Sequence, residues 1–405
     1  MKPPAAVPRS SSWRIVAIAM FACGWGGNQF TPLLLMYRRL GGYSALSVDA
    51  FLGAYVVGLV PGLLLAGPVS DRRGRRPVLV AGTVASALAS LVLCFGGQGA
   101  WAIYAGRLVT GVAVGIAMSV GSSWVKELSA GPDGGLPARR AALCLTAGFG
   151  LGAGVAGAVA QWGPWPMVSP YAVHLLLTVA IPVLLLRVPE TRPPLARAAG
   201  SLRGLLAALM SDLRVPAPAR RRFRLVVLPM APWVFGSAGL AYAVMPQLVG
   251  SRAGDWGLAY ATGLTVLTLG MGVAVQPVAK RLRGGAPVAA MAVMLLGAVP
   301  CAANAVVLST WLAAAAAAVL GAGYGIAVVS GLLEIQRMAG ADDLAGLTGL
   351  YYLLAYAGFL LPAVLAALSA WLSYPVMLSA VAAAALICLG LVVTGARAAA
   401  TAAAE

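Results

Sequence analysis

The chain has 405 residues, of which 61% are hydrophobic and only 10% are charged. This composition provides too little polar surface to cover a water-soluble globule, and it excludes soluble enzymes and soluble nucleic-acid-binding domains. The formal net charge of +17 must therefore be explained in a protein that lies in a lipid bilayer.

Apolar stretches of about 20 residues recur along the chain, which is the length that an α-helix needs to cross the hydrocarbon core. We expect an all-α membrane protein with twelve transmembrane helices. The first span contains Asn28 and Gln29 and lacks a cleavage site, so we do not expect a signal peptide. The predicted spans are 14–37, 46–67, 77–96, 101–125, 141–161, 169–187, 225–248, 257–279, 287–308, 311–333, 344–368 and 373–395.

Basic residues gather on one side of these spans. If the N-terminus is cytoplasmic, 24 of the 28 Lys and Arg residues fall in cytoplasmic segments. This asymmetry follows the positive-inside rule and predicts an inner-membrane protein with both termini in the cytoplasm. The charge then orients the protein, and we expect no nucleic-acid partner. The five Cys and the single His have no metal-binding spacing, so we expect no metal and no cofactor.

One long polar interruption, rich in Arg and Pro, divides the chain. We expect an N-terminal six-helix bundle at 1–187, a cytoplasmic linker at 188–222 and a C-terminal six-helix bundle with a short tail at 223–405. The two bundles share weak internal similarity: Ala147-Gly148-Phe149 recurs 210 residues later, and Glu127 recurs as Glu334. This pattern indicates duplication of a six-helix unit.

The connection between the second and third spans carries the most specific motif. It reads Gly67-Pro68-Val69-Ser70-Asp71-Arg72-Arg73-Gly74-Arg75-Arg76-Pro77. It resembles the signature G-x-x-x-D-R-x-G-R-R/K of the major facilitator superfamily and matches it at every defined position. The resemblance implies two pseudo-symmetric bundles that rock around a central cavity, and it extends to the twelve-helix drug and metabolite exporters.

The resemblance also implies a cytoplasmic gate at this connection. It places Asp71 near the start of helix 11, where the helix dipole favours an anion. A topology anchor without a gating role is the alternative. The implied gating residues are Gly67, Asp71, Arg72, Gly74, Arg75, Arg76 and Glu127.

Helix 4 contains a cation, Arg107, in an arrangement similar to the R-x-x-x-G element of the family. A lone cation inside the bilayer is costly unless it is paired or hydrated, so we expect Arg107 to face the cavity. Asn28, Gln29 or a substrate anion would then satisfy it. The alternative is that Arg107 snorkels to the outer interface.

In this family helices 1, 4, 7 and 10 line the cavity, which points to their polar and aromatic residues. A mostly apolar cavity with a few polar groups suits a small amphipathic molecule. Polar packing between helices is the alternative role. The implied substrate contacts are Trp25, Asn28, Gln29, Arg107, Tyr242, Gln247 and Tyr324.

Helix 5 resembles the antiporter signature G-x-x-x-G-P-x-x-G-G through Gly148, Gly152 and Gly157. It departs from that signature because Ala153 replaces the Pro and Ala156 replaces a Gly. The glycines also suit close helix packing, which is the alternative interpretation.

Titratable groups inside the spans are scarce. Asp49 is expected near the outer end of helix 2, and Glu127 and Glu334 are expected at cytoplasmic ends. His174 titrates in the right range and is a candidate proton site, with a structural role as the alternative. The coupling ion therefore stays open.

We expect a monomeric secondary transporter that works by alternating access on a small-molecule substrate. Proton-coupled export of a small amphipathic metabolite or drug is the leading hypothesis. Proton-coupled uptake, facilitated diffusion and a non-transporting sensor on the same fold are the alternatives. An enzyme is not expected, because no nucleophile with a base and no metal cluster appears in the sequence.

Overall fold

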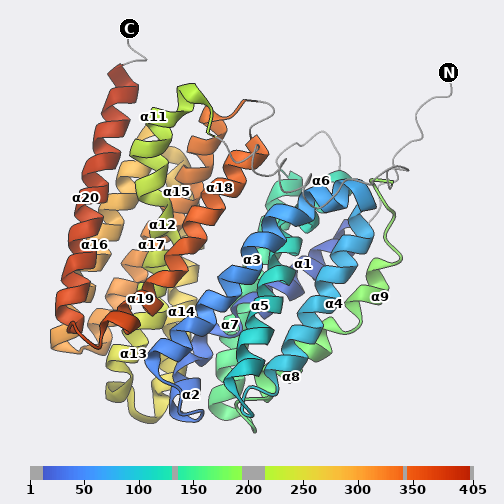
Figure 1. The fold of residues 1–405 in the computed structure, drawn as a ribbon, viewed down its shortest axis with the longest axis horizontal. Coiled ribbons are helices and arrows are strands. Elements are labelled where there is room, and N and C mark those ends of the chain that lie inside the picture. Colours follow the sequence, from blue (N-terminus) through green and yellow to red (C-terminus); the bar gives the residue numbers. More distant parts are fainter. Residues whose placement is uncertain (1–11, 130–135, 194–214, 341–343, 402–405) are drawn as a thin grey trace. The chain divides into compact units, whose positions relative to one another are not determined.

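A computed structural model describes residues 12–129, 136–193, 215–340 and 344–401. All regular elements in these ranges are helical (Figure 1). Helices suit a bilayer because they satisfy their backbone hydrogen bonds internally. The α-helices are α1 (Trp13–Asn28), α2 (Leu34–Arg39), α3 (Ala45–Arg73), α4 (Arg75–Leu93), α5 (Ala100–Ile116), α6 (Ser122–Leu128), α7 (Leu136–Trp162), α8 (Ser169–Thr178), α9 (Ile181–Leu185), α11 (Arg220–Arg222), α12 (Leu228–Gly239), α13 (Met245–Val249), α14 (Gly257–Ala274), α15 (Gln276–Arg281), α16 (Ala286–Val307), α17 (Thr310–Met338), α18 (Leu344–Ala357), α19 (Leu361–Leu368) and α20 (Tyr374–Thr401).

Within the described ranges, nine helical stretches are long and apolar enough to cross a membrane. One of them, Ala217–Arg281, has 65 residues and covers two predicted spans. The backbone turns inside it at Gly254, whose φ of 53° falls in the left-handed region that favours glycine. Ser169–Leu185 is apolar but shorter. The number twelve stays a prediction.

The first predicted span is broken near its middle, so α1 has only 16 residues. A 3₁₀ turn, η1 (Thr31–Leu33), separates α1 from α2, and Pro32 stands in this turn. Proline lacks the N–H that would continue the α1 hydrogen-bond ladder. The α-helical hydrogen-bond ladder is therefore interrupted after Asn28.

Contacts divide the chain into two compact units. The first unit comprises Met1–Asn28, Val57–Gly152 and Tyr171–Gly200, and the second comprises Gln29–Val56, Ala153–Pro170 and Ser201–Glu405. Segments 29–56 and 153–170 thus belong with the C-terminal part by contacts. The predicted division at 188–222 stays a prediction, because most of that linker lies outside the described residues, as does the end of the tail.

The first unit has a core built from α1, α3, α4, α6 and α9. Met20, Leu79, Trp124 and Leu185 are fully buried in it. Helices α4 and α5 run alongside each other (Figure 1). In the second unit α16 packs beside both α17 and α20 (Figure 1).

Large apolar side chains also lie on the outside of the helices. Trp311 is 86% exposed and Leu176 is 76% exposed. Exposed apolar surface on this scale would be unfavourable in water but suits contact with lipid.

Glycines at the duplicated sequence allow close helix contacts in both units. A Cβ atom at Gly148 of α7 would overlap the backbone of Phe21 in α1. In the second unit a Cβ atom at Gly358 would overlap the backbone of Pro232 in α12. The recurring Ala-Gly-Phe sequence therefore marks an equivalent packing position in each unit, which supports the duplication.

We predict that Gly148→Ala destabilises the protein by about 1–3 kcal/mol, because the added methyl group forces α7 away from the α1 backbone. Gly150→Ala is the matched control on the same helix, because nothing lies within 4 Å of a Cβ atom there. Thermal unfolding of the purified variants measures both. An equal melting temperature for Gly148→Ala and the wild type would contradict the packing role.

Candidate functional site

The loop motif forms a sharp turn between α3 and α4. Gly74 has a φ of 98°, which a residue with a side chain rarely adopts. Directly beyond it, the Glu190 carboxylate accepts hydrogen bonds from the backbone N–H groups of Arg75 and Arg76, each at 2.9 Å. These are N–H groups of the first turn of α4, so Glu190 neutralises the positive end of the helix.

Arg75 is the centre of the charged cluster at this turn. Its side chain is buried, and its Nη1 lies 2.9 Å from Asp71 Oδ1. Its Nη2 lies 2.9 Å from Glu127 Oε1, and its Nε donates to the same oxygen at 3.2 Å. Two carboxylates thus compensate one buried guanidinium, which uses its fixed fork of donors. The Thr191 hydroxyl donates to Glu127 as well.

The structure therefore brings together Asp71, Gly74, Arg75 and Glu127 from the predicted gate, while Arg72 and Arg76 are half-buried beside them. Gly67 lies one turn before Asp71 in α3, where a Cβ atom would approach Ser119 Oγ to 3.0 Å. The expected position of Asp71 at the start of helix 11 involves the other unit and stays a prediction.

Sequence reasoning missed Glu190 and Thr191 as members of this cluster. Both follow the sixth predicted span, in a Pro-Glu-Thr-Arg run that was interpreted as the start of the linker. Arg192 of the same run also lies near Asp71, at 3.6 Å. The signal that could have indicated this role is the position of Glu190, an acidic residue shortly after the end of a span.

The second unit has its own buried ion cluster. Glu334 is 1% exposed and accepts hydrogen bonds from Arg222 Nε at 2.5 Å and Arg337 Nη1 at 2.7 Å. The predicted correspondence between Glu127 and Glu334 thus extends to a shared arginine pairing. Lys280, which replaces the aspartate of the motif in this half, is exposed.

Arg107 lies inside the first unit and is 1% exposed. Its Nη1 donates a hydrogen bond of 3.2 Å to the carbonyl oxygen of Gly27, in the last turn of α1. The negative end of the α1 helix dipole favours the cation at this position. The sequence alone does not reveal a backbone partner for Arg107.

The remaining predicted cavity residues of the first span lie in this turn or directly after it. Asn28 donates to the Phe149 carbonyl oxygen at 3.0 Å, and Gln29 is fully buried. Trp25 is 6% exposed, and within the described part of the chain its indole Nε1 has no hydrogen-bond acceptor. A buried N–H donor of this kind is suited to a ligand oxygen.

The helix-5 glycines have a structural explanation. A Cβ atom at Gly152 would come within 2.6 Å of the Trp25 carbonyl oxygen, so this glycine admits α1 as Gly148 does. Gly157, in the second unit, lies against the side chain of Thr262. All three glycines therefore serve close packing.

His174 connects three helices of the first unit and is fully buried. Its Nδ1 lies 2.7 Å from Ser90 Oγ, and its Nε2 lies 2.8 Å from the Ala22 carbonyl oxygen. Because a carbonyl group only accepts, Nε2 must carry the proton. This geometry favours the structural alternative for His174.

Aromatic side chains from three helical segments stack in the second unit. Phe235 lies parallel to both Tyr356 and Phe359, with ring centroids 4.3 and 4.6 Å apart. Tyr324 packs beside Phe235 at 5.8 Å, and Tyr242 lies near Phe359 at 6.5 Å. The structure thus places the two predicted tyrosines in one aromatic group.

Gln247 does not belong to that group. Its Oε1 accepts from Arg38 Nη1 at 3.1 Å, and its Nε2 donates to Asp49 Oδ1 at 2.9 Å. Asp49 is 2% exposed, so the carboxylate expected near the end of a span is buried among helices.

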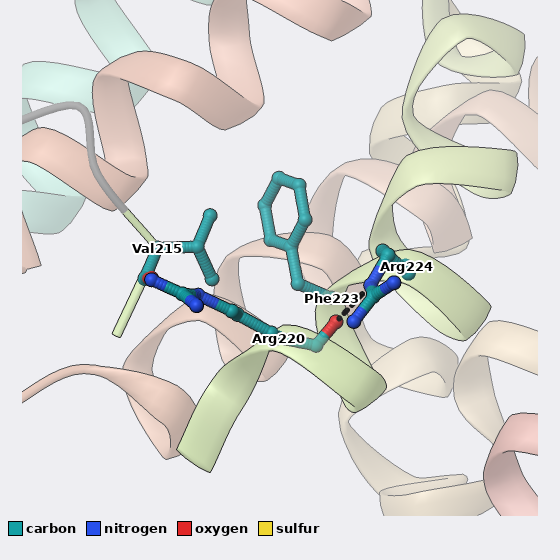
Figure 2. Close-up of a pocket in the computed structure, with 4 residues that line it drawn as sticks. All are labelled: Val215, Arg220, Phe223 and Arg224. Atoms are coloured by element: carbon teal, nitrogen blue, oxygen red, sulfur yellow. Dashed lines mark hydrogen bonds between the residues drawn. The ribbon is translucent and has the colours of Figure 1, made fainter. Parts of the chain in front are cut away.

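A hollow of about 490 Å³ lies at the start of the helical stretch 217–281, lined by Val215, Arg220, Phe223 and Arg224. Figure 2 shows the Arg224 side chain hydrogen-bonded to the carbonyl oxygen of Arg220, one helical turn earlier. None of the predicted substrate contacts lines this hollow. Among the residues that the structure describes, no group of three His, Cys, Asp or Glu side chains is arranged to bind a metal ion.

Comparison with known proteins agrees with this architecture. Residues 15–363 match the model of the Major Facilitator Superfamily. The fold is similar to a peptide-transporter (POT) family structure in complex with 5-aminolevulinic acid, with a TM-score of 0.76 and 11% identity over 95% of this chain and 96% of that one. It is also similar to the nucleoside transporter NupG, with a TM-score of 0.70 and 13% identity over 95% and 99% of the two chains.

Two curated relatives come from Pseudomonas putida. A gallate transporter is 31% identical over 175 residues, which cover 42% of this chain and 37% of that protein. A 4-hydroxybenzoate transporter is 25% identical over 293 residues, which cover 65% of this chain and 56% of that protein. The matched regions thus span between about a third and just over half of the relatives' lengths.

We predict that Glu190→Ala lowers the stability of the first unit by about 1–2 kcal/mol, because two N–H groups at the start of α4 lose a charged acceptor. Arg192→Ala is the control: its ion pair with Asp71 is largely exposed, and such pairs contribute little. The melting temperatures of the purified variants provide the comparison. Equal losses in both variants would argue against a specific capping role for Glu190.

Proposed function

Because the chain belongs to the Major Facilitator Superfamily, we propose that it carries a small aromatic carboxylate across the membrane by alternating access. On this proposal it is a monomeric transporter of the inner membrane with both termini in the cytoplasm, and not an enzyme. The names of the two curated relatives support the substrate class, since both are transporters of hydroxylated benzoates.

The observation that carries the proposal is the buried guanidinium of Arg107. A guanidinium presents five N–H donors in a planar fork, and a carboxylate matches two of them at once. The low dielectric of the bilayer makes such a pairing favourable for an anion that has already lost its water. The buried indole N–H of Trp25, in the same unit, offers a further donor of suitable chemistry.

The second unit supports the aromatic part of the proposal on its own contacts. Phe235, Tyr356 and Phe359 stack with nearly parallel rings, 18° apart for each pair with Phe235. Flat aromatic surfaces bind flat aromatic ligands by offset stacking or edge contacts, each worth about 0.5–1.5 kcal/mol. The chemistry of this group suits an aromatic substrate, independently of Arg107.

We infer that transport is uptake coupled to protons, which was an alternative at the sequence level. A membrane potential that is negative inside opposes the entry of an anion by roughly 2.3 kcal/mol per 100 mV and favours its exit. A proton that accompanies the anion cancels this cost, so proton coupling has a clear use in uptake. The glycines that suggested export are accounted for by helix packing. Export in exchange for protons stays the second candidate, and the following assay separates the two.

We predict that proteoliposomes containing the protein accumulate labelled 4-hydroxybenzoate when the outside is acidic, and that Arg107→Lys lowers the initial rate about tenfold. Lysine keeps the charge but lacks the planar fork. Arg252→Lys is the matched control, since Arg252 is exposed. Protein-free liposomes correct for passive entry of the neutral acid.

Accumulation with an acidic interior instead would indicate exchange for protons and would favour export. No accumulation of 4-hydroxybenzoate or gallate in either gradient would remove the proposed substrate class. An unchanged rate in Arg107→Lys would remove Arg107 from carboxylate binding.

A further inference from the structure

A hydrogen-bonded relay of three side chains lies within the second unit. Gln247 stands at its centre, accepting from Arg38 with its carbonyl oxygen and donating to Asp49 with its amide nitrogen. The cation thus meets the acceptor end of the amide and the anion meets the donor end. Reversing the amide would break both bonds, so the two charges determine its orientation.

The relay connects segments that are far apart in sequence. Arg38 lies in the last turn of α2 and Asp49 in the second turn of α3, whereas Gln247 lies in α13, about 200 residues away. The first two belong to the predicted N-terminal bundle and the third to the C-terminal bundle. Bonds of this kind must break if the two bundles separate at this end.

Two further sets of bonds also join residues of the predicted N-terminal bundle to residues of the predicted C-terminal bundle. Arg39 donates to the carbonyl oxygens of Gly250 and Gly254, at 2.9 and 3.2 Å. Gln161, in the last turn of α7, donates to the Asp255 carbonyl oxygen at 3.0 Å and accepts from the Ala259 backbone N–H at 2.9 Å. We call these bonds, together with the relay, the junction.

Among the side chains that make the junction bonds, Asp49 carries the carboxylate whose charge a proton can remove. Arginine stays charged throughout the physiological range, and glutamine does not titrate. Two groups act electrostatically on Asp49: Arg38, and the phenol of Tyr374 at the start of α20. The phenol is neutral in this range, since tyrosine normally titrates near ~10.

We propose that Asp49 is a proton-binding site and that its protonation releases the junction. A proton on the Asp49 oxygen that faces Gln247 would place two donors opposite each other, which cannot form a hydrogen bond. If Gln247 turns to accept from the protonated acid, its carbonyl no longer faces Arg38. If the proton binds the other carboxyl oxygen, the Gln247 bond remains but its acceptor is no longer charged. In each case the relay loses a hydrogen bond to a charged group, which weakens the junction.

The direction of the effect links this site to transport. By the positive-inside rule, Arg38, Arg39 and Arg252 are expected on the outer side of the membrane. Acid on that side would then open the junction to the medium, and a proton would enter with each substrate anion. This last step rests on the proposed uptake function, whereas the proton site itself does not.

The test measures opening directly and needs no substrate. In a variant without the five native cysteines, spin labels are placed at Leu46→Cys and Ser251→Cys, two exposed positions on opposite partners of the junction. Double electron–electron resonance then gives the label separation at pH 5 and pH 8. We expect the ratio of longer to shorter separations to rise about tenfold at pH 5. In Asp49→Asn the longer separation should dominate at both pH values.

Two variants keep this test decisive. Asp255→Asn is the matched control: its exposed side chain is a carboxylate beside the junction, but its backbone makes the bond, so the pH response should be that of the wild type. Gln247→Leu removes both relay bonds while leaving the carboxylate, and it should favour the longer separation at both pH values. Elution as a single symmetrical peak verifies that each variant is folded.

A wild-type separation that is the same at pH 5 and pH 8, or a normal pH response in Asp49→Asn, would overturn the proposal. A normal junction response without transport of aromatic acids would remove the proposed substrate and leave the proton site intact. Transport of aromatic acids without a pH response of the junction would remove the proton site alone.

Discussion

A bilayer offers no water to a buried charge, and this constraint governs the structure. Every charge that remains among the helices must find its partner in the protein or in a ligand, since an uncompensated ion costs several kcal/mol. Arg75 lies between two carboxylates, Glu334 between two arginines, and Arg107 against the end of a broken helix. The few buried ions are therefore informative about function, because apolar residues would satisfy the same positions at lower cost.

The local pattern of the sequence was sufficient to predict a helical membrane protein and the turn between α3 and α4. The length of an apolar stretch indicates a span directly. A glycine between two spans indicates a tight turn, and Gly74 adopts a positive φ there. The motif could not reveal Glu190, which is 115 residues from Arg75 along the chain. Pairings over such distances depend on how helices pack, and a single sequence does not encode them in any local pattern.

The same reason explains the differences at Arg107 and Asp49. Hydropathy indicates one continuous first span, so it does not reveal that a carbonyl group in the last turn of α1 accepts a hydrogen bond from Arg107. The sequence shows only that Asp49 lies near the end of a span, whereas its burial depends on Gln247 and on neighbouring helices. Glycine patterns are ambiguous in a related way: Gly148 and Gly152 fit an exporter signature and a packing face equally well. The close approach of the α1 backbone shows the packing role, and the exporter interpretation stays a prediction.

The central claim is that the protein recognises a carboxylate attached to an aromatic ring. Calorimetric titration of the purified protein with 4-hydroxybenzoate and with its neutral amide, 4-hydroxybenzamide, tests this directly, because the two ligands differ little in size and differ in charge. We expect the acid to bind at least about tenfold more tightly, since a guanidinium forms its strongest hydrogen bonds with an anion. Equal affinity for the two compounds, or binding of neither, would contradict the claim.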